Sequence, residues 1–342
     1  MSDVYDSVWP ILPGSPSISG LSRTSRRILT GLHSLDRALA GADGTPGLPI
    51  RTGVEVYGRW ETGKSTLAYY LAGRVAADGR IVLVDLEGGS RDEYLRSAVG
   101  QSGFSGTVHT VPAEEGGNPR THEAMLKEGA NALLEEGVTC VVLDSAAMVQ
   151  PVMEREGDMD EAFMGRRAQT LAKFTRRYVA WLNSVEEDKL VIIVNHQLFD
   201  LQGYGKISPG GDSLKFGIGA RLWITRSETI ENAEGAFEAE LQVDKLRFGG
   251  RPAPKEKKEQ VARVVIIPGI GVSPELTALF DAMAIRDKTY AKRASGIVSY
   301  RLNEDDEWTK LEKLVDIVAR VKSGDRSGFE PFYKILREHG DE

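Results

Sequence analysis

The fold is decided by one stretch, Val54–Thr66, which reads VEVYGRWETGKST. A strand pattern leads into a turn bounded by glycines at positions 58–65, and a helical pattern opens at Thr66. The turn matches G-x-x-x-x-G-K-[ST] at every fixed position. In this motif the glycines let backbone N–H groups turn inward around phosphate oxygens, and the helix N-terminus adds positive potential. The alternative, an ordinary glycine-rich turn, does not account for the strand before it and the helix after it.

The motif predicts ATP and Mg²⁺ as ligands. Lys64 would place its ammonium group on the β- and γ-phosphates, and Ser65 would offer its hydroxyl to Mg²⁺. The predicted ATP and Mg²⁺ site includes the whole loop, namely Gly58, Arg59, Trp60, Glu61, Thr62, Gly63, Lys64, Ser65 and Thr66.

Acidic residues end two further apolar strand patterns. Asp144 follows the run Val138–Leu143, and we expect it to join Ser65 in holding Mg²⁺. Glu87 comes after the run Ile81–Val84 and is a candidate catalytic base that orients the attacking water. Its alternative is a solvated loop carboxylate, and spacing alone does not decide between the two.

A further strand pattern, Leu190–Val194, ends in Asn195-His196-Gln197. Polar residues at the carboxyl end of a parallel strand are where a sensor of the γ-phosphate would lie. His196 and Gln197 are therefore both candidates for this catalytic role. The alternative for His196 is a hydrogen-bonded structural histidine.

Near-continuous Val, Ile and Leu runs alternate with helical patterns at 65–76, 92–99, 122–134 and 163–182. Such runs indicate strands buried on both faces, so the predicted fold class is α/β with a mostly parallel central sheet. Residues 232–267 instead favour antiparallel strands with turns. We predict a short N-terminal arm over 1–27 (a possible oligomerisation segment), a core over 28–268 and a small helical C-terminal region over 269–342.

Composition limits the class of protein. The 342 residues are 41% hydrophobic and 27% charged, as in a soluble globular chain. No apolar run approaches the ~20 residues that a membrane span needs, so no membrane contact is expected. The single cysteine, Cys140, excludes an internal disulfide framework and a cysteine-rich zinc site, and it favours the cytoplasm. A net charge of −7 means that any contact with DNA needs locally concentrated cations.

Two segments offer such cations. One is a helical pattern without acids that carries Arg166, Arg167, Lys173, Arg176 and Arg177. Its alternative is a solvated helix face or a subunit contact. The other is the segment 198–212, which interleaves Phe199, Tyr204 and Lys206 with glycines. Proteins that bind single-stranded DNA combine stacking aromatics with cations in this way.

The order of these motifs resembles that of the RecA-type recombinases from about Ile28 to Tyr300. The matching segments are 31–39 (GLHSLDRAL), Glu87 with Tyr94, 143–147 (LDSAA), 156–165, 210–216 (GGDSLKF), Arg221-Leu222 and 274–300. Their order and spacing carry the resemblance. It implies a RecA-like P-loop ATPase core over 28–268 with two DNA-binding loops.

The resemblance also implies roles for particular residues. Tyr94 would stack on adenine. The first DNA-binding loop and the helix after it would supply Met159, Arg166 and Arg167, and the second loop would supply Phe199, Tyr204, Lys206, Gly210 and Gly211. The residues that would reach the ATP of a neighbouring subunit are Lys215, Phe216, Lys245 and Arg247.

The chain departs from the bacterial pattern at two motifs. The loop interior is Arg59-Trp60-Glu61-Thr62 where bacterial members usually have Pro-Glu-Ser-Ser. The sensor segment has a histidine after Asn195, which is similar to the phage UvsX recombinases, as is the block 308–342. The resemblance therefore points toward phage UvsX-type RecA proteins.

These features predict a DNA-dependent ATPase that forms a helical homo-oligomeric filament on single-stranded DNA. It would promote homologous pairing and strand exchange with double-stranded DNA in recombination and repair. We expect it in the cytoplasm, which would be the host cytoplasm if a phage encodes it. Two alternatives remain, a RecA-core ATPase of another class (a ring helicase or a KaiC-like oligomer) and an accessory recombinase paralogue without strand exchange.

Overall fold

The computed structural model describes residues 26–156, 165–199, 206–207, 209–247, 261–285 and 288–340. Its centre is a nine-stranded sheet with the strand order β15-β14-β13-β12-β3-β9-β8-β4-β5. The strands in chain order are β3 (Gly53–Gly58), β4 (Arg80–Asp85), β5 (Thr107–Thr110), β8 (Val138–Asp144), β9 (Leu190–His196), β12 (Ile218–Thr229), β13 (Phe237–Leu246), β14 (Val261–Ile267) and β15 (Gly271–Ser273). From β12 to β5 all neighbours run parallel, and from β12 to β15 they run antiparallel. The predicted α/β class with a mostly parallel sheet is confirmed.

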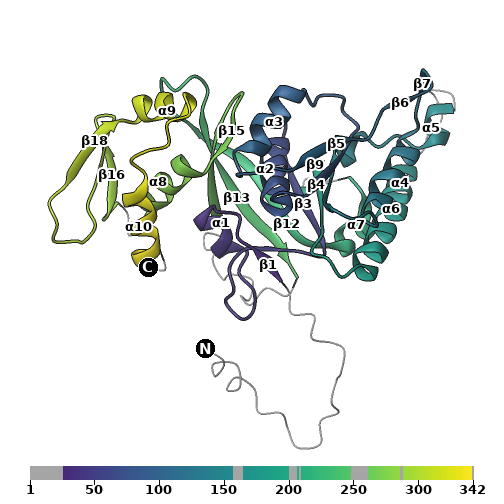
Figure 1. Cartoon of the computed structure of the whole chain (residues 1–342), viewed down its shortest axis with the longest axis horizontal. Helices are drawn as coiled ribbons and strands as arrows, with labels where there is room; N and C mark the ends of the chain where they lie inside the picture. Colours follow the sequence, from purple (N-terminus) through teal and green to yellow (C-terminus); the bar gives the residue numbers. More distant parts are fainter. Residues whose placement is uncertain are drawn as a thin grey trace, which may run out of the picture.

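Helices cover both faces of the sheet (Figure 1). One face packs against α1 (His33–Ala38), α2 (Lys64–Ala76) and α3 (Asp92–Gly100). The other packs against α4 (His122–Ala132), α6 (Arg166–Ser184) and α7 (Gly211–Gly217). Strand β8 shows why the middle of such a strand, residues 140–143, is continuously apolar. Cys140 and Val142 belong to the first core, whereas Val141 and Leu143 belong to the second, because successive side chains point to opposite faces.

The predicted helices lie close to where their periodicity placed them. Helix α4 begins at its expected residue because Thr121 caps it, its side chain accepting a hydrogen bond from the Ala124 amide. Helix α6 begins at Arg166, after Gly165 in the left-handed region at φ 81°. The predicted start at residue 163 lies outside the described residues.

The C-terminal region contains more than the predicted helices. It has α8 (Pro274–Ala284), α9 (Leu314–Lys322) and α10 (Glu330–His339), and also a three-stranded antiparallel sheet of β16 (Ala291–Ala294), β17 (Ile297–Tyr300) and β18 (Thr309–Lys313). The hairpin β16–β17 turns at Ser295-Gly296, where both φ angles are positive. Such a two-residue turn is a hairpin signal that the helical interpretation overlooked. The region packs against Val265 and Ile267 of β14 in a third apolar core and lies at the β15 side of the central sheet (Figure 1).

Short elements complete the described chain. They are β1 (Arg27–Ile28), β2 (Leu48–Pro49), β6 (Glu114–Glu115), β7 (Asn118–Pro119), β10 (Leu198–Phe199), β11 (Lys206–Ile207), α5 (Val152–Glu156) and a 3₁₀ turn over Ala146–Met148. Residues 1–25 of the predicted arm lie outside the described residues. Among the helices of the described part, none is both long and apolar enough to cross a membrane.

Candidate active site

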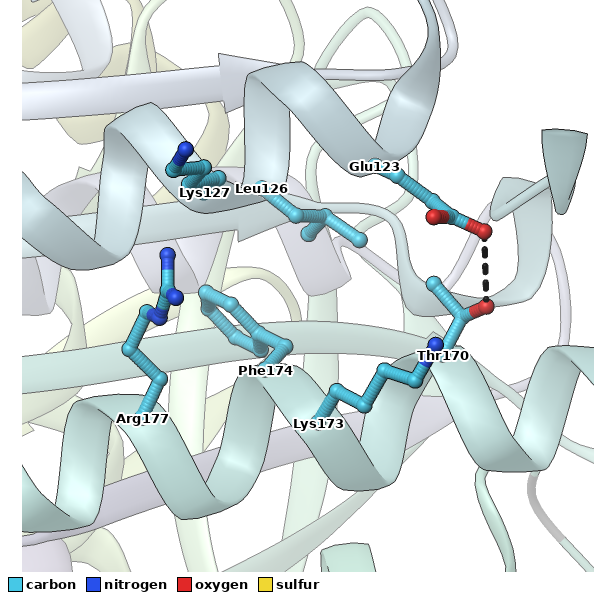
Figure 2. A pocket seen from close by; sticks show the side chains of 7 residues that line it. All are labelled: Glu123, Leu126, Lys127, Thr170, Lys173, Phe174 and Arg177. Atoms are coloured by element: carbon cyan, nitrogen blue, oxygen red, sulfur yellow. Dashed lines mark hydrogen bonds between the residues drawn. The ribbon is translucent and has the colours of Figure 1, made fainter.

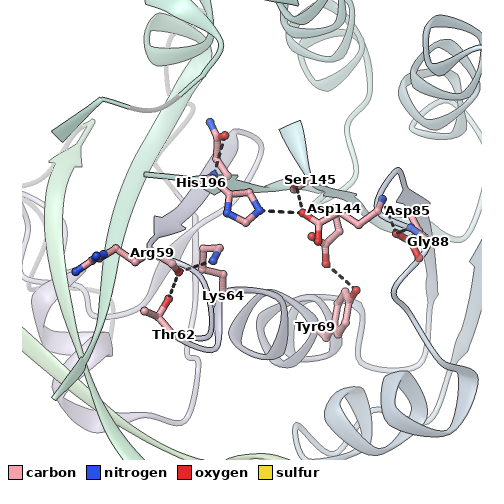
Figure 3. A network of polar contacts seen from close by, with 11 residues as sticks. Arg59, Thr62, Lys64, Tyr69, Asp85, Gly88, Asp144, Ser145 and His196 are labelled. Atoms are coloured by element: carbon pink, nitrogen blue, oxygen red, sulfur yellow. Dashed lines mark hydrogen bonds and ion pairs between the residues drawn. The ribbon is translucent and has the colours of Figure 1, made fainter. Parts of the chain in front are cut away.

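The loop between β3 and α2 closes on itself around one carbonyl. The Lys64 ammonium donates a hydrogen bond to the Arg59 carbonyl at 2.6 Å, and the Thr62 hydroxyl donates to the same oxygen at 2.9 Å. Figure 3 shows both side chains turned toward Arg59. Gly63 lies at φ 86°, and a Cβ there would come within 2.2 Å of the Ile266 side chain. The turn therefore needs glycine for both its backbone conformation and its packing.

The middle of the loop faces solvent. Arg59 and Glu61 are exposed, and the Trp60 side chain is 74% exposed. Lys64 by contrast is buried, and burial lowers the pKa of its ammonium group, while Glu87 and Asp144 act in the opposite direction. Three of the four residues that differ from the bacterial pattern, Arg59, Trp60 and Glu61, thus face solvent, whereas Thr62 and Lys64 are buried.

Asp144 ends β8 with a carboxylate suited to a cation. Its Oδ2 accepts a hydrogen bond from the Tyr69 hydroxyl at 2.7 Å, and no donor among the described residues contacts the buried Oδ1. Burial raises the pKa of Asp144 to about 6, although the nearby Tyr69 and Ser65 hydroxyls favour the ionised form. A buried carboxylate oxygen without a donor, next to the Ser65 hydroxyl, fits a Mg²⁺ ligand set.

Glu87 lies just beyond β4, within hydrogen-bond reach of two other strand ends. Its Oε1 is 3.0 Å from Nε2 of His196 at the end of β9, and it also accepts a hydrogen bond from the Ser145 hydroxyl after β8. Burial alone would raise the pKa of Glu87, but the hydrogen bonds from Ser145 and His196, with the charges of His196 and Lys64, hold it below its ordinary value. The carboxylate is therefore ionised at neutral pH and can accept a proton or orient water.

The two sensor candidates point in different directions. His196 contacts Glu87, whereas the Gln197 side chain accepts a hydrogen bond from Trp223 Nε1 at 2.9 Å. Consecutive residues of an extended chain alternate between faces. The structure thus brings His196, and not Gln197, next to Glu87.

Tyr94 of α3 contacts the first turn of α2. Its hydroxyl shares a hydrogen bond with the Thr66 hydroxyl, and its ring is half-buried. The contact places the aromatic ring beside the phosphate loop, where adenine stacking was predicted from the resemblance.

The four residues expected to reach a neighbouring subunit cluster at the C-terminal end of α7. Lys245 Nζ donates to the Lys215 carbonyl, and Arg247 donates to the Phe216 carbonyl at 3.0 Å. The Phe216 side chain is 71% exposed. Burial, followed by the charges of Arg247 and Arg221, lowers the pKa of Lys245. Both cations are therefore held by their own chain at its surface.

The predicted DNA-binding residues are only partly described. Met159 and Tyr204 lie outside the described residues, and for Phe199 and Lys206 only the backbone is described, as paired positions of β10 and β11. Arg166 is exposed, and Arg167 donates to the Val149 carbonyl at 3.0 Å. Gly210 and Gly211 open α7 with φ angles of 118° and 63°.

The basic face of α6 borders a cavity of about 270 Å³ shared with α4 (Figure 2). Leu126 and Phe174 line the cavity, and Lys127, Lys173 and Arg177 surround it. Sequence reasoning found the α6 cations but missed Lys127, because only packing brings α4 beside α6.

Sequence reasoning also missed Ser145, Tyr69 and Glu55. Tyr69 lies four residues after Ser65, one helical turn on, and Ser145 directly follows Asp144; both spacings were visible signals. Glu55 is an acid inside an otherwise apolar strand pattern, and it is fully buried. A charge in such a strand needs partners, and this requirement could have identified it.

Fold and site together define a P-loop protein with a RecA-like core. The family model of the RecA N-terminal domain matches residues 14–257, and the chain belongs to the RecA family. The protein RecA of Clostridium acetobutylicum is 28% identical over 326 residues, which cover 91% of this chain and 85% of that protein. The protein RecA of a Nostoc species is 30% identical over 251 residues, which cover 72% of this chain and 64% of that protein. The family resemblance predicted from the sequence is confirmed.

Proposed function

We propose that this chain is an ATP-dependent DNA recombinase that forms helical filaments on single-stranded DNA and promotes strand exchange with homologous double-stranded DNA. The end of β9 is the observation on which the proposal depends. His196 contacts Glu87 there, and the segment 198–212 begins two residues later. A candidate phosphate sensor that continues directly into a candidate DNA segment supports an ATPase that responds to DNA.

The chemical step is phosphoryl transfer from ATP to water. Lys64 would hold the β- and γ-phosphates, and Ser65 and Asp144 would hold Mg²⁺, which supplies charge neutralisation. Glu87 would orient the attacking water, since its low pKa keeps it ionised. His196 would sense the γ-phosphate, because it lies 3.0 Å from that carboxylate while Gln197 is bound to Trp223. Tyr94 would stack on adenine.

Assembly would make ATP an interface ligand. Lys245 and Arg247 would turn from the α7 carbonyls toward the γ-phosphate of the neighbouring subunit, with Lys215 and Phe216 beside them. Heterologous contacts of this kind do not close on themselves and so generate a helical filament. ATP binding would favour assembly, and hydrolysis would release it.

DNA would bind through both loop regions. Phe199 or Tyr204 would stack on or wedge between bases, and Lys206 would meet a phosphate. Met159 of the first loop would contribute, with Arg166 and Arg167 of the helix after it. The histidine at 196 and the block 308–342 support a closer kinship to phage UvsX-type RecA proteins. Such a protein would act in the cytoplasm, and in the host cytoplasm if a phage encodes it.

The test combines hydrolysis with imaging. The parent chain should hydrolyse ATP faster with single-stranded DNA and form filaments in negative-stain images with a non-hydrolysable ATP analogue. Lys64→Ala should lose nucleotide-dependent assembly. Closed hexamers would instead indicate a ring helicase or a KaiC-like oligomer. Filaments that bind DNA but exchange no strands would indicate an accessory paralogue.

A further inference from the structure

We propose that Asn195, anchored on the buried carboxylate of Glu55, is the positioning residue that ties the DNA segment to the nucleotide sensor. This inference rests on the proposed function. It concerns the connection between the two sites, which is made by one fully buried side chain.

Glu55 provides a fixed anchor inside the sheet. It is fully buried in the middle of β3, where an isolated charge would be very unfavourable. Two donors compensate it, Arg221 Nε of β12 at 2.5 Å on Oε2 and Asn195 Nδ2 of β9 at 2.8 Å on Oε1. The strand register sets Arg221 directly beside Glu55. A carboxylate bound from both neighbouring strands has little freedom to move.

Asn195 makes three hydrogen bonds through its side-chain amide. Nδ2 donates to Glu55 and, at 2.8 Å, to the Pro209 carbonyl, while Oδ1 accepts from the His196 backbone amide at 3.0 Å. Two acceptors on one side and one N–H donor on the other allow only this orientation of the amide. The side chain therefore joins the sensor residue to the end of the segment 198–212.

Pro209 directly precedes Gly210, the residue before the first turn of α7. The next residue, Gly210, lies at φ 118°, and a Cβ there would come within 2.4 Å of the Leu214 side chain. A displacement at Pro209 is thus passed to α7, whose last carbonyls hold Lys245 and Arg247. A shift of His196 toward a γ-phosphate would reach the DNA segment and the interface cations through the Asn195 amide.

The sharpest variant is Asn195→Asp, which keeps the shape and replaces the NH₂ group by an oxygen. That oxygen would face the Pro209 carbonyl and the Glu55 carboxylate. The readout is the coupling factor, which is the affinity for fluorescein-labelled dT36 with ATPγS divided by the affinity without it, at pH 8. We expect a factor of about 5–150 in the parent and about 1–3 in the variant. Because coupling between two ligands is reciprocal, dT36 should raise the affinity for ATPγS by the same factor in each protein. This factor should therefore fall equally in the variant.

The double variant Glu55→Gln/Asn195→Asp separates coupling from stability. A glutamine at 55 can donate to an aspartate at 195, so the double variant should unfold at a higher temperature than Asn195→Asp. It leaves the Pro209 carbonyl facing an oxygen, so its coupling factor should stay near 1. Asp281→Asn, a change at another buried carboxylate, is the matched control and should keep the parent's factor.

Three results would overturn the inference. One is a folded double variant with the parent's coupling factor, and another is an equal loss of coupling in Asp281→Asn. If Asn195→Asp does not fold, the coupling factor of the double variant alone tests the inference. The third result is a parent chain that binds dT36 equally with and without ATPγS. It would overturn the proposed function as well, which distinguishes it from the other two.

Discussion

At the scale of single residues, the candidate site places two carboxylates, Glu87 and Asp144, in environments that shift their pKa values in opposite directions. Glu87 accepts hydrogen bonds from Ser145 and His196, which lower its pKa, whereas burial raises the pKa of Asp144 to about 6. A carboxylate that stays ionised is suited to orient water. A buried carboxylate with a free oxygen is suited to a divalent cation, whose charge replaces the lost solvation.

Glu87→Gln should therefore slow ATP hydrolysis without preventing ATP binding. One positioned base contributes about 10²–10⁴ to a rate, so hydrolysis should fall by that factor. Steady-state phosphate release and binding of a fluorescent ATP analogue measure the two effects. Glu93→Gln, an exposed acid on α3, is the control. Hydrolysis by Glu87→Gln at the parent's rate would show that another group is the base.

His196→Ala and Gln197→Ala should differ, since only His196 contacts Glu87. We expect His196→Ala to reduce DNA-stimulated hydrolysis at least about tenfold more than Gln197→Ala, on the scale of one catalytic contact. Gln197→Ala leaves the Trp223 N–H without its acceptor and should mainly lower the melting temperature. Rates of DNA-stimulated ATP hydrolysis and melting temperatures, measured on the same preparations, test this. The reverse ranking of the two hydrolysis rates would assign the sensor to Gln197.

At the scale of elements, the two ends of α7 meet different neighbours. Its first residues follow Pro209, which Asn195 holds, and its last carbonyls accept hydrogen bonds from Lys245 and Arg247 of β13 and the turn after it. Cations at a helix C-terminus are favoured by the helix dipole. A short helix held at both ends can move as a unit, and this is the element on which the proposed subunit contact depends.

Mixing two inactive variants should restore activity if the cations act across the interface. Lys245→Ala/Arg247→Ala keeps its own nucleotide site, and Glu87→Gln keeps its cations. In an equal mixture, about a quarter of the interfaces would combine an intact site with intact cations, and DNA-stimulated hydrolysis should return there. Lys310→Ala, an exposed cation on β18, controls for charge loss. A mixture as inactive as its components would place the cations in their own subunit's site.

At the scale of the whole molecule, a buried carboxylate joins the central sheet to the C-terminal region. Asp281 of α8 is buried, with 5% of its surface exposed, and accepts a hydrogen bond from the Ser34 amide of α1 at 3.0 Å. Burial raises its pKa from 3.8 to about 7, the backbone and side chain of Ser34 and the charge of Arg263 oppose the shift, and Glu238 adds to it. The folded chain therefore holds this proton more tightly than the unfolded chain does.

Stability should consequently fall as the pH rises from about 4 to about 7, where the folded state is protonated and the unfolded state is not. Below that window both states are protonated, and above it both are ionised with the full cost of burial. The slope from this group is at most about 1.4 kcal/mol per pH unit. Melting temperatures between pH 5 and 8 should fall more steeply in the parent than in Asp281→Asn. Parallel curves of melting temperature against pH for the two proteins would contradict the raised pKa of Asp281.

The sequence by itself determined the local parts of this protein. The pattern at 58–65 correctly predicted a loop between a strand and a helix, because its glycines and its flanking strand and helix are consecutive in the chain. Continuous apolar runs predicted the parallel sheet, because strands such as β4, β8 and β9 contribute side chains to the cores on both faces. The polar ends of β8 and β9 were placed correctly because parallel strands end at one edge.

Only the tertiary structure decided which of these groups meet. His196 and Gln197 are equivalent in the sequence, and the pleat of β9 separated them. Packing between segments distant in the chain places Lys127 beside the α6 cations. It also brings Arg221 and Asn195 into contact with Glu55. The C-terminal strands escaped prediction because four-residue strands carry a weak periodic signal. Periodicity and spacing report neighbours along the chain, whereas these contacts depend on strand order and helix packing, which only the folded chain defines.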